Sequence, residues 1–220
     1  MLLLVDLDNT LIDRAGAFAH WAALFAGELD GVDARAAASW TVEADRGGYA
    51  PRPELAAAMR ERFGLSGPLP ELIDRIVYEH VEFVAPYEGV PARLEAFAAA
   101  GARIVIVTNG PVEQQSRKLR RTGVDRHATA VVISEGIGVK KPDRRIFEEA
   151  LRRAVAAGVD PDDGPIWMVG DDVRADMAGA RALGMRTGWI AHGREWPHEW
   201  HPTVSGATAA EVLDLVRDSD

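Results

Sequence analysis

Leu2-Leu-Leu-Val-Asp-Leu-Asp-Asn-Thr10 joins an unbroken apolar run to two acids that are separated by a single residue. Such a run is typical of a strand buried on both faces, as in the middle of a parallel sheet. Side chains two residues apart in a strand point to the same face, about 6.5–7 Å apart, so Asp6 and Asp8 are expected to project together from the carboxyl end of the strand. Buried charge is costly unless it is paired, and a hard cation such as Mg²⁺ prefers carboxylate oxygen. For this segment alone, the alternative is a polar strand end followed by a turn.

The composition describes a chain that can bury a core and carries an acidic surface. Hydrophobic residues make up 47% of its 220 residues, the formal net charge is −9, and there is no cysteine. The acidic balance argues against nucleic acid or an anionic membrane as the main partner, and the lack of cysteine excludes disulfides, thiolate metal sites and a cysteine nucleophile. The opening apolar run is too short for a signal peptide or a membrane span. We therefore expect a cytoplasmic protein, whose oligomeric state cannot be read from its sequence.

Residues 15–86 show a helical pattern and no convincing strand. Apolar residues at positions 18, 21, 22 and 25 share one helix face, and three further helical patterns follow, separated by glycine- and proline-containing stretches. This segment is predicted to be an all-helical insertion. Its candidate specificity residues are Trp21, Arg46, Tyr49 and His80, although a histidine on an apolar stripe is more often a hydrogen-bonded core residue.

The remaining residues, 1–14 and 87–220, alternate between apolar runs and helical patterns. Further strands are expected at 103–107, 130–133, 165–169 and 186–190, which indicates an α/β fold with a parallel sheet and helices on both faces. Ligands of such sheets bind outside the carboxyl ends of the strands. The polar residues expected at this edge are Asp6, Asp8, Thr108, Lys141 and Asp171.

These residue types together suit the hydrolysis of a phosphate monoester. One aspartate could attack phosphorus, while a second protonates the leaving oxygen and then activates water. Lys141, the Thr108 hydroxyl and the backbone N–H groups of Asn109 and Gly110 could hold the phosphate oxygens. Asp171 would complete a metal site, and Asp176 would support it or Lys141. Taken singly, the Thr108 stretch could be a simple turn, Lys141 a solvated lysine and Asp172 a helix N-cap.

Four stretches in order along the chain resemble the motifs of the haloacid dehalogenase (HAD) superfamily. They are Asp6-Leu-Asp-Asn-Thr10, Thr108-Asn-Gly110, Gly138-Val-Lys-Lys-Pro142 and Gly170-Asp-Asp-Val-Arg-Ala-Asp176. The run from Thr108 through Gln115 to Lys118 and Leu119 also looks similar, at low specificity, to phosphatases of nucleoside monophosphates and sugar phosphates.

The resemblance implies a Rossmann-like parallel sheet core with an inserted all-helical cap domain, the cap being residues 15–86. It implies Asp6 as nucleophile, Asp8 as general acid/base, and Mg²⁺ held by Asp6, the Asp8 backbone carbonyl and Asp171. The dehalogenase branch of the family lacks the second acid of the first motif and needs no metal. Because Asp8 is present, the expected activity is Mg²⁺-dependent hydrolysis of a small phosphorylated metabolite through an aspartyl-phosphate.

Other readings stay open from the sequence. A phosphomutase or a dehalogenase-type hydrolase would share this fold, and a non-catalytic relative could bind a phosphate ligand. A phospho-accepting receiver domain also gathers acids, a threonine and a lysine at one sheet edge, but it places the acceptor acid after the third strand and has no helical insertion.

Overall fold

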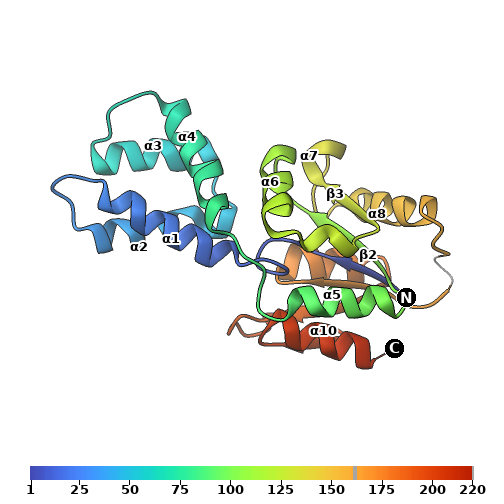
Figure 1. Cartoon of the computed structure of the whole chain (residues 1–220). Coiled ribbons are helices and arrows are strands. Elements are labelled where there is room, and N and C mark those ends of the chain that lie inside the picture. Colours follow the sequence, from blue (N-terminus) through green and yellow to red (C-terminus); the bar gives the residue numbers. More distant parts are fainter. Residues whose placement is uncertain (161–162, 220) are drawn as a thin grey trace. The chain divides into compact units, whose positions relative to one another are not determined.

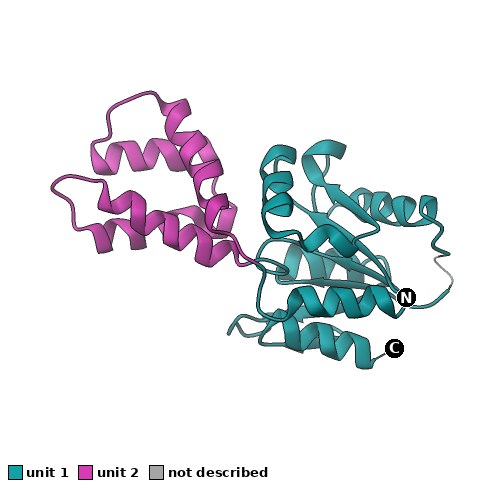
Figure 2. Cartoon of the chain, viewed as in Figure 1, with its two compact units in different colours: residues 1–12, 86–220 teal, residues 13–85 magenta. Residues whose placement is uncertain are grey.

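The computed structural model describes residues 1–160 and 163–219 of the chain. They divide into two compact units, one formed by Met1–Ile12 with Pro86–Asp220 and the other by Asp13–Ala85 (Figure 2). The chain thus leaves the first unit directly after the opening motif and returns to it at Pro86. Each unit is described by itself below.

Unit 1 is built on a parallel sheet. Within the described residues the sheet has six strands in the order β3-β2-β1-β4-β5-β6, and every neighbouring pair is parallel. The strands are β1 (Leu2–Val5), β2 (Arg103–Thr108), β3 (Ala130–Ile133), β4 (Ile166–Gly170), β5 (Arg186–Ile190) and β6 (Val204–Gly206). The opening strand β1 lies between β2 and β4, which explains why all four of its residues are apolar and buried.

Helices cover both faces of this sheet, as the apolar strands require. Helices α5 (Val90–Ala99) and α10 (Ala209–Asp218) lie along one face, and α8 (Arg144–Ala156) lies along the other (Figure 1). Leu2 and Leu4 of β1 share a core cluster with Ile146 and Phe147 of α8. The remaining helical elements of unit 1 are α6 (Val112–Thr122), η3 (Val124–His127), α7 (Ser134–Ile137), η4 (Val173–Ala178) and α9 (Gly179–Arg181).

This architecture confirms the predicted fold class, a Rossmann-like α/β core with an all-helical insertion. The strand order runs from β1 outward to β3 and then resumes with β4 on the other side of β1. The order therefore reverses between β1 and β4, and ligands of doubly wound sheets bind in the crevice at such a reversal. The acids that follow β1 and β4 meet at this point.

Two elements differ from the sequence prediction. No strand was expected after Ile190, but the structure has the short edge strand β6 there; Trp196 and Trp200, which lie between β5 and β6, pack against the core of unit 1. Three residues of which one is glycine carry too little alternation to predict a strand. The helix expected after Asp172 is a π-helical turn, η4, followed by the short α9.

Unit 2 consists of helices in the described residues. They are α1 (Arg14–Gly27), α2 (Ala34–Asp45), η1 (Arg46–Gly48), α3 (Arg52–Phe63), α4 (Leu69–Tyr78) and η2 (Glu79–Phe83). Asp13 and Asp33 cap α1 and α2, because their side chains accept bonds from backbone N–H groups of the first turn. The apolar face of α1 that the spacing predicted is the core of the unit, where Phe18, Trp21 and Phe25 are buried.

The candidate specificity residues of unit 2 separate into two kinds. Trp21 and His80 are 2% and 1% exposed; the Trp21 indole donates to Glu79, and the His80 ring lies 3.0 Å from the Ile76 carbonyl oxygen. Both are thus core residues, as the alternative for His80 anticipated. Arg46 and Tyr49 are exposed.

A buried ion-pair network fixes the loop that carries Arg46 and Tyr49. Asp45 is 1% exposed; its carboxylate is paired with the Arg14 guanidinium and accepts a 2.6 Å bond from Arg52. Burial alone would raise the pKa of Asp45, but the bonds and charges of the two arginines outweigh it and lower the pKa below its ordinary value.

Among the described residues, no helix has the length and apolar character to cross a bilayer.

Candidate active site

Lys141 is the centre of the polar cluster at the carboxyl edge of the sheet. Its ammonium group lies 2.5 Å from an oxygen of Asp6, 2.7 Å from an oxygen of Asp176 and 2.6 Å from the Val107 carbonyl oxygen. Both Lys141 and Asp6 are buried. A buried ammonium needs such partners, since an unpaired charge would not be stable there. The solvated-lysine alternative for Lys141 is therefore wrong.

The Asn109 side chain fixes the backbone of Lys141. The Asn109 amide oxygen accepts a 2.8 Å bond from the Lys141 backbone N–H, and its amide nitrogen donates a 3.1 Å bond to the Lys141 carbonyl oxygen. The peptide bond between Lys141 and Pro142 is cis. The Asn109 side chain thus ties the turn after β2 to the loop that carries Lys141, whereas the prediction for Asn109 concerned its backbone N–H.

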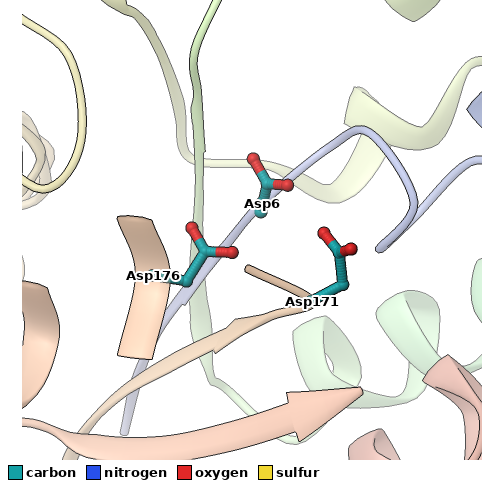
Figure 3. Close-up of side chains that lie close together, drawn as sticks. All are labelled: Asp6, Asp171 and Asp176. Atoms are coloured by element: carbon teal, nitrogen blue, oxygen red, sulfur yellow. The ribbon is translucent and has the colours of Figure 1, made fainter. Parts of the chain in front are cut away.

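Three carboxylates converge beside Lys141. Asp6 follows β1, Asp171 follows β4 and Asp176 belongs to η4, and one oxygen of each lies within 4.8 Å of the others (Figure 3). Gly170 makes room for this arrangement, because a Cβ atom at that position would lie 2.2 Å from an Asp176 oxygen. The backbone N–H of Asp172 donates a 3.0 Å bond to Asp176, and the Asp172 side chain caps the turn that follows.

Burial dominates the electrostatics of this group of acids, and the charge of Lys141 offsets it only in part. Burial raises the pKa of Asp6 to about 7 although Lys141 opposes the shift, and burial together with the Asp6 charge raises the pKa of Asp171 to about 7. Burial likewise raises the pKa of Asp176 to about 6 against the effect of Lys141. Burial lowers the pKa of Lys141, but Asp176 and Asp6 outweigh it and raise that pKa overall.

Asp8 and Thr108 form a second group, joined by helix α6. The Lys118 ammonium donates to both Asp8 oxygens at 2.7 and 2.8 Å, and the Gln115 amide nitrogen donates to Asp8 at 3.0 Å and to Thr108 at 2.6 Å. Sequence reasoning assigned no role to Gln115 or Lys118. Their spacing of three residues on one helix face was visible, but a buried lysine cannot be told from an exposed one by spacing alone.

Two further contacts bear on predicted residues. The Gly110 backbone N–H, expected to face a phosphate, donates a 3.0 Å bond to the Ser134 hydroxyl at the end of β3. The Arg194 guanidinium donates to the Asp171 carbonyl oxygen at 2.7 Å and lies 3.2 Å from its carboxylate. Neither Ser134 nor Arg194 was singled out from the sequence, since each lies outside the four motifs.

The comparisons with known proteins agree with this fold. The model of the haloacid dehalogenase-like hydrolase family matches residues 1–184. N-acetylmuramic acid 6-phosphate phosphatase of Pseudomonas aeruginosa is 30% identical over 97% of this chain and 93% of its own length. The pyrimidine 5'-nucleotidase YjjG of Escherichia coli is 34% identical over 66% of this chain and 63% of its own. The chain thus covers less than two thirds of this second relative.

A solved structure shows the same fold at low sequence identity. The magnesium-bound HAD-hydrolase YfnB of Bacillus subtilis superposes with a TM-score of 0.75 at 20% identity, over 98% of this chain and 97% of its own. Because the family model matches most of the chain, the protein belongs to the haloacid dehalogenase-like hydrolases. The family prediction from the four motifs is confirmed.

The donor set at this site fits a hard divalent cation. Asp6 and Asp171 offer carboxylate oxygens, with Asp176 in the same cluster, and such oxygens are the ligands that Mg²⁺ prefers. Burial is the main cause of the raised pKa values of all three acids, and repulsion from neighbouring acids adds to it. A cation bound beside these acids would favour their ionised forms.

Proposed function

We propose that this protein is a Mg²⁺-dependent phosphatase that hydrolyses a small phosphorylated metabolite through an aspartyl-phosphate on Asp6. One observation carries the proposal: Asp6 lies at the sheet's reversal point, paired with Lys141 and within 4.8 Å of the Asp171 and Asp176 oxygens. Two relatives whose names denote hydrolysis of phosphate monoesters support it.

The proposed hydrolysis takes place in two steps. In the first, an Asp6 oxygen attacks phosphorus in line, the bond to the leaving oxygen breaks, and a proton from Asp8 goes to that oxygen. In the second, Asp8 takes a proton from water while the water oxygen attacks phosphorus and the bond to Asp6 breaks. The Thr108 hydroxyl holds a phosphate oxygen throughout. Lys141, whose three donors contact Asp6, Asp176 and the Val107 carbonyl oxygen, holds Asp6 in place and would bind a phosphate oxygen by exchanging one of these partners.

The cation would be held by Asp6, Asp171 and the Asp8 backbone carbonyl, with Asp176 supporting the set. When bound, it would cancel the repulsion between the carboxylates and the anionic phosphate. Lys141 remains necessary beside it, because its ammonium touches the nucleophile directly. Unit 2 would serve as the cap, and Arg46 and Tyr49 are its exposed candidates for contact with the substrate.

The direct test replaces the nucleophile. Asp6→Asn should lower the turnover of p-nitrophenyl phosphate by at least about 10³-fold, because the covalent intermediate cannot form without the nucleophile. Asp33→Asn is a matched control with the same chemical change at an exposed helix cap, where asparagine caps as well as aspartate. Retained activity in Asp6→Asn with an unchanged circular dichroism spectrum would remove Asp6 as the nucleophile.

Metal dependence separates this proposal from dehalogenase chemistry. EDTA should abolish turnover and added Mg²⁺ should restore it, whereas indifference to EDTA would favour the metal-free branch of the family. The same assay on pyrimidine nucleoside 5'-monophosphates and on N-acetylmuramic acid 6-phosphate, the substrate types in the relatives' names, would narrow the substrate class.

A further inference from the structure

Helix α6 directs two buried polar side chains, those of Gln115 and Lys118, at Asp8. Gln115 is 0% exposed and Lys118 is 2% exposed, although lysine is almost never fully buried unless it is paired. They stand three residues apart on the same helix face, and both donate to the Asp8 carboxylate. The opening motif and α6 are therefore tied together through Asp8.

The hydrogen bonds in this group can run in one direction only. The Lys118 ammonium has donors and no acceptor, so both Asp8 oxygens that it contacts act as acceptors while Asp8 is ionised. When Oδ1 carries the proton for the leaving oxygen, Oδ2 still accepts from Lys118 and from Gln115. Gln115 must then present its NH₂ group to Asp8, and this chemistry fixes which way its amide lies. The same nitrogen donates to the Thr108 hydroxyl oxygen at 2.6 Å. Because Thr108 accepts from Gln115, its own hydrogen remains to be donated elsewhere.

The neighbouring glycine supports the placement of the Gln115 amide independently. Gly110 has a φ of +146°, and a Cβ atom there would lie 3.1 Å from the Gln115 amide carbon and 3.3 Å from its oxygen. The turn after β2 thus leaves space for this amide beside Thr108. A larger residue at 110 would have to push Gln115 away from both of its acceptors.

We propose that Gln115 and Lys118 are positioning residues of the active site, which hold the Asp8 side chain in one rotamer and make the Thr108 hydroxyl a hydrogen-bond donor toward the phosphate. This inference rests on the proposed phosphatase function and deepens it. Without Lys118, Asp8 can rotate away from the leaving oxygen. Without Gln115, the Thr108 hydrogen can turn to other acceptors and the phosphate loses a donor.

Leaving-group dependence distinguishes this role from a purely structural one. An alkoxide leaving group needs the proton that Asp8 delivers, whereas p-nitrophenolate departs without one. The first step alone is reported by kcat/KM, because departure of the leaving group makes that step irreversible. Lys118→Met should therefore lower kcat/KM on an alkyl phosphate such as glycerol 2-phosphate by about 10²–10⁴-fold, the usual range for a general acid, and on p-nitrophenyl phosphate by less than about 10-fold. Lys118→Arg keeps a cation at Asp8 and should recover much of the loss.

The role of Gln115 is tested through binding of inorganic phosphate. Gln115→Met should raise the inhibition constant of phosphate about 10-fold or more, the effect of losing one hydrogen bond to a charged group. Thr108→Val should give the same rise, and the double variant should show no further increase because both changes remove the same donor.

Matched controls lie beside each position on the same helix. Arg117→Met, at an exposed ion pair with Glu113, and Gln114→Met should leave both measurements unchanged, and circular dichroism and thermal melting should show folded protein for every variant. Equal losses on both substrates, or additive effects of Gln115→Met and Thr108→Val, would overturn the inference. Asp6→Asn separates the two proposals, because its retained activity would end the phosphatase mechanism itself.

Discussion

Gly170→Ala is the sharpest test of how Asp176 and Lys141 are held. The new methyl group would lie 2.2, 2.5 and 2.8 Å from the Oδ2, Cγ and Cβ atoms of Asp176, and atoms do not approach so closely without moving. Gly170 has no positive φ, so alanine meets no backbone strain there. The whole effect of the substitution is therefore steric and falls on Asp176.

The expected cost follows from the contacts that Asp176 would lose. Overpacking in a closed core costs about 1–3 kcal/mol, and a hydrogen bond to a charged group, here from the Asp172 backbone N–H, contributes about 1.5–3 kcal/mol. The substitution would also strain the ion pair between Asp176 and Lys141. We expect the free energy of unfolding to fall by about 3–5 kcal/mol, within the sum of these two ranges, and Mg²⁺ to bind at least about 10-fold more weakly.

Chemical denaturation and calorimetric titration with Mg²⁺ measure the two quantities separately. Gly27→Ala is the control, because a Cβ atom at Gly27 meets nothing within 4 Å and alanine is favoured over glycine in a helix by about 0.5–1 kcal/mol. Surface substitutions usually change the free energy of unfolding by no more than about 0.5 kcal/mol. If the free energy of unfolding of Gly170→Ala differs from that of the parent by no more than this, and Mg²⁺ binds equally well, Asp176 does not occupy the position described.

Two further perturbations, one in each unit, test the electrostatics of buried acids. In EDTA, the melting temperature should fall as the pH rises from about 5 to 8. The pKa of Asp171 is raised from 3.8 to about 7, so the folded protein binds more protons than the unfolded chain across this range. Deprotonation therefore destabilises the folded protein. Asp171→Asn should flatten that slope in thermal melts, and a slope unchanged by the variant would contradict the assignment. In unit 2, Asp45→Asn should cost about 3–5 kcal/mol because it leaves the buried Arg14 charge without its counterion. Glu113→Gln breaks an exposed ion pair and should leave the melting temperature unchanged, so similar losses in both variants would show that burial of Asp45 is not the cause.

Local pattern was enough to predict the architecture. Apolar runs such as Leu2–Val5 carry the signature of a buried strand wherever they occur, and the rule that parallel strands share a carboxyl edge brought Asp6, Lys141 and Asp171 to one place without coordinates. The helical spacing around Phe18 predicted the core of unit 2 for the same reason, because the period of 3.6 residues is a property of the sequence itself.

Tertiary contacts decided the roles of individual polar residues. Sequence spacing gave no reason to expect that the Asn109 side chain binds the Lys141 loop or that Lys118 is buried, because each outcome depends on groups far away along the chain. The edge strand β6 and the π-helical turn that carries Asp176 likewise take their form from neighbouring segments. The sequence by itself determined the fold, the family and the group of residues at the sheet edge, since these follow from periodicity and motif order. Only the folded chain decided which polar group faces which, because hydrogen-bond partners and burial are set by packing between distant segments.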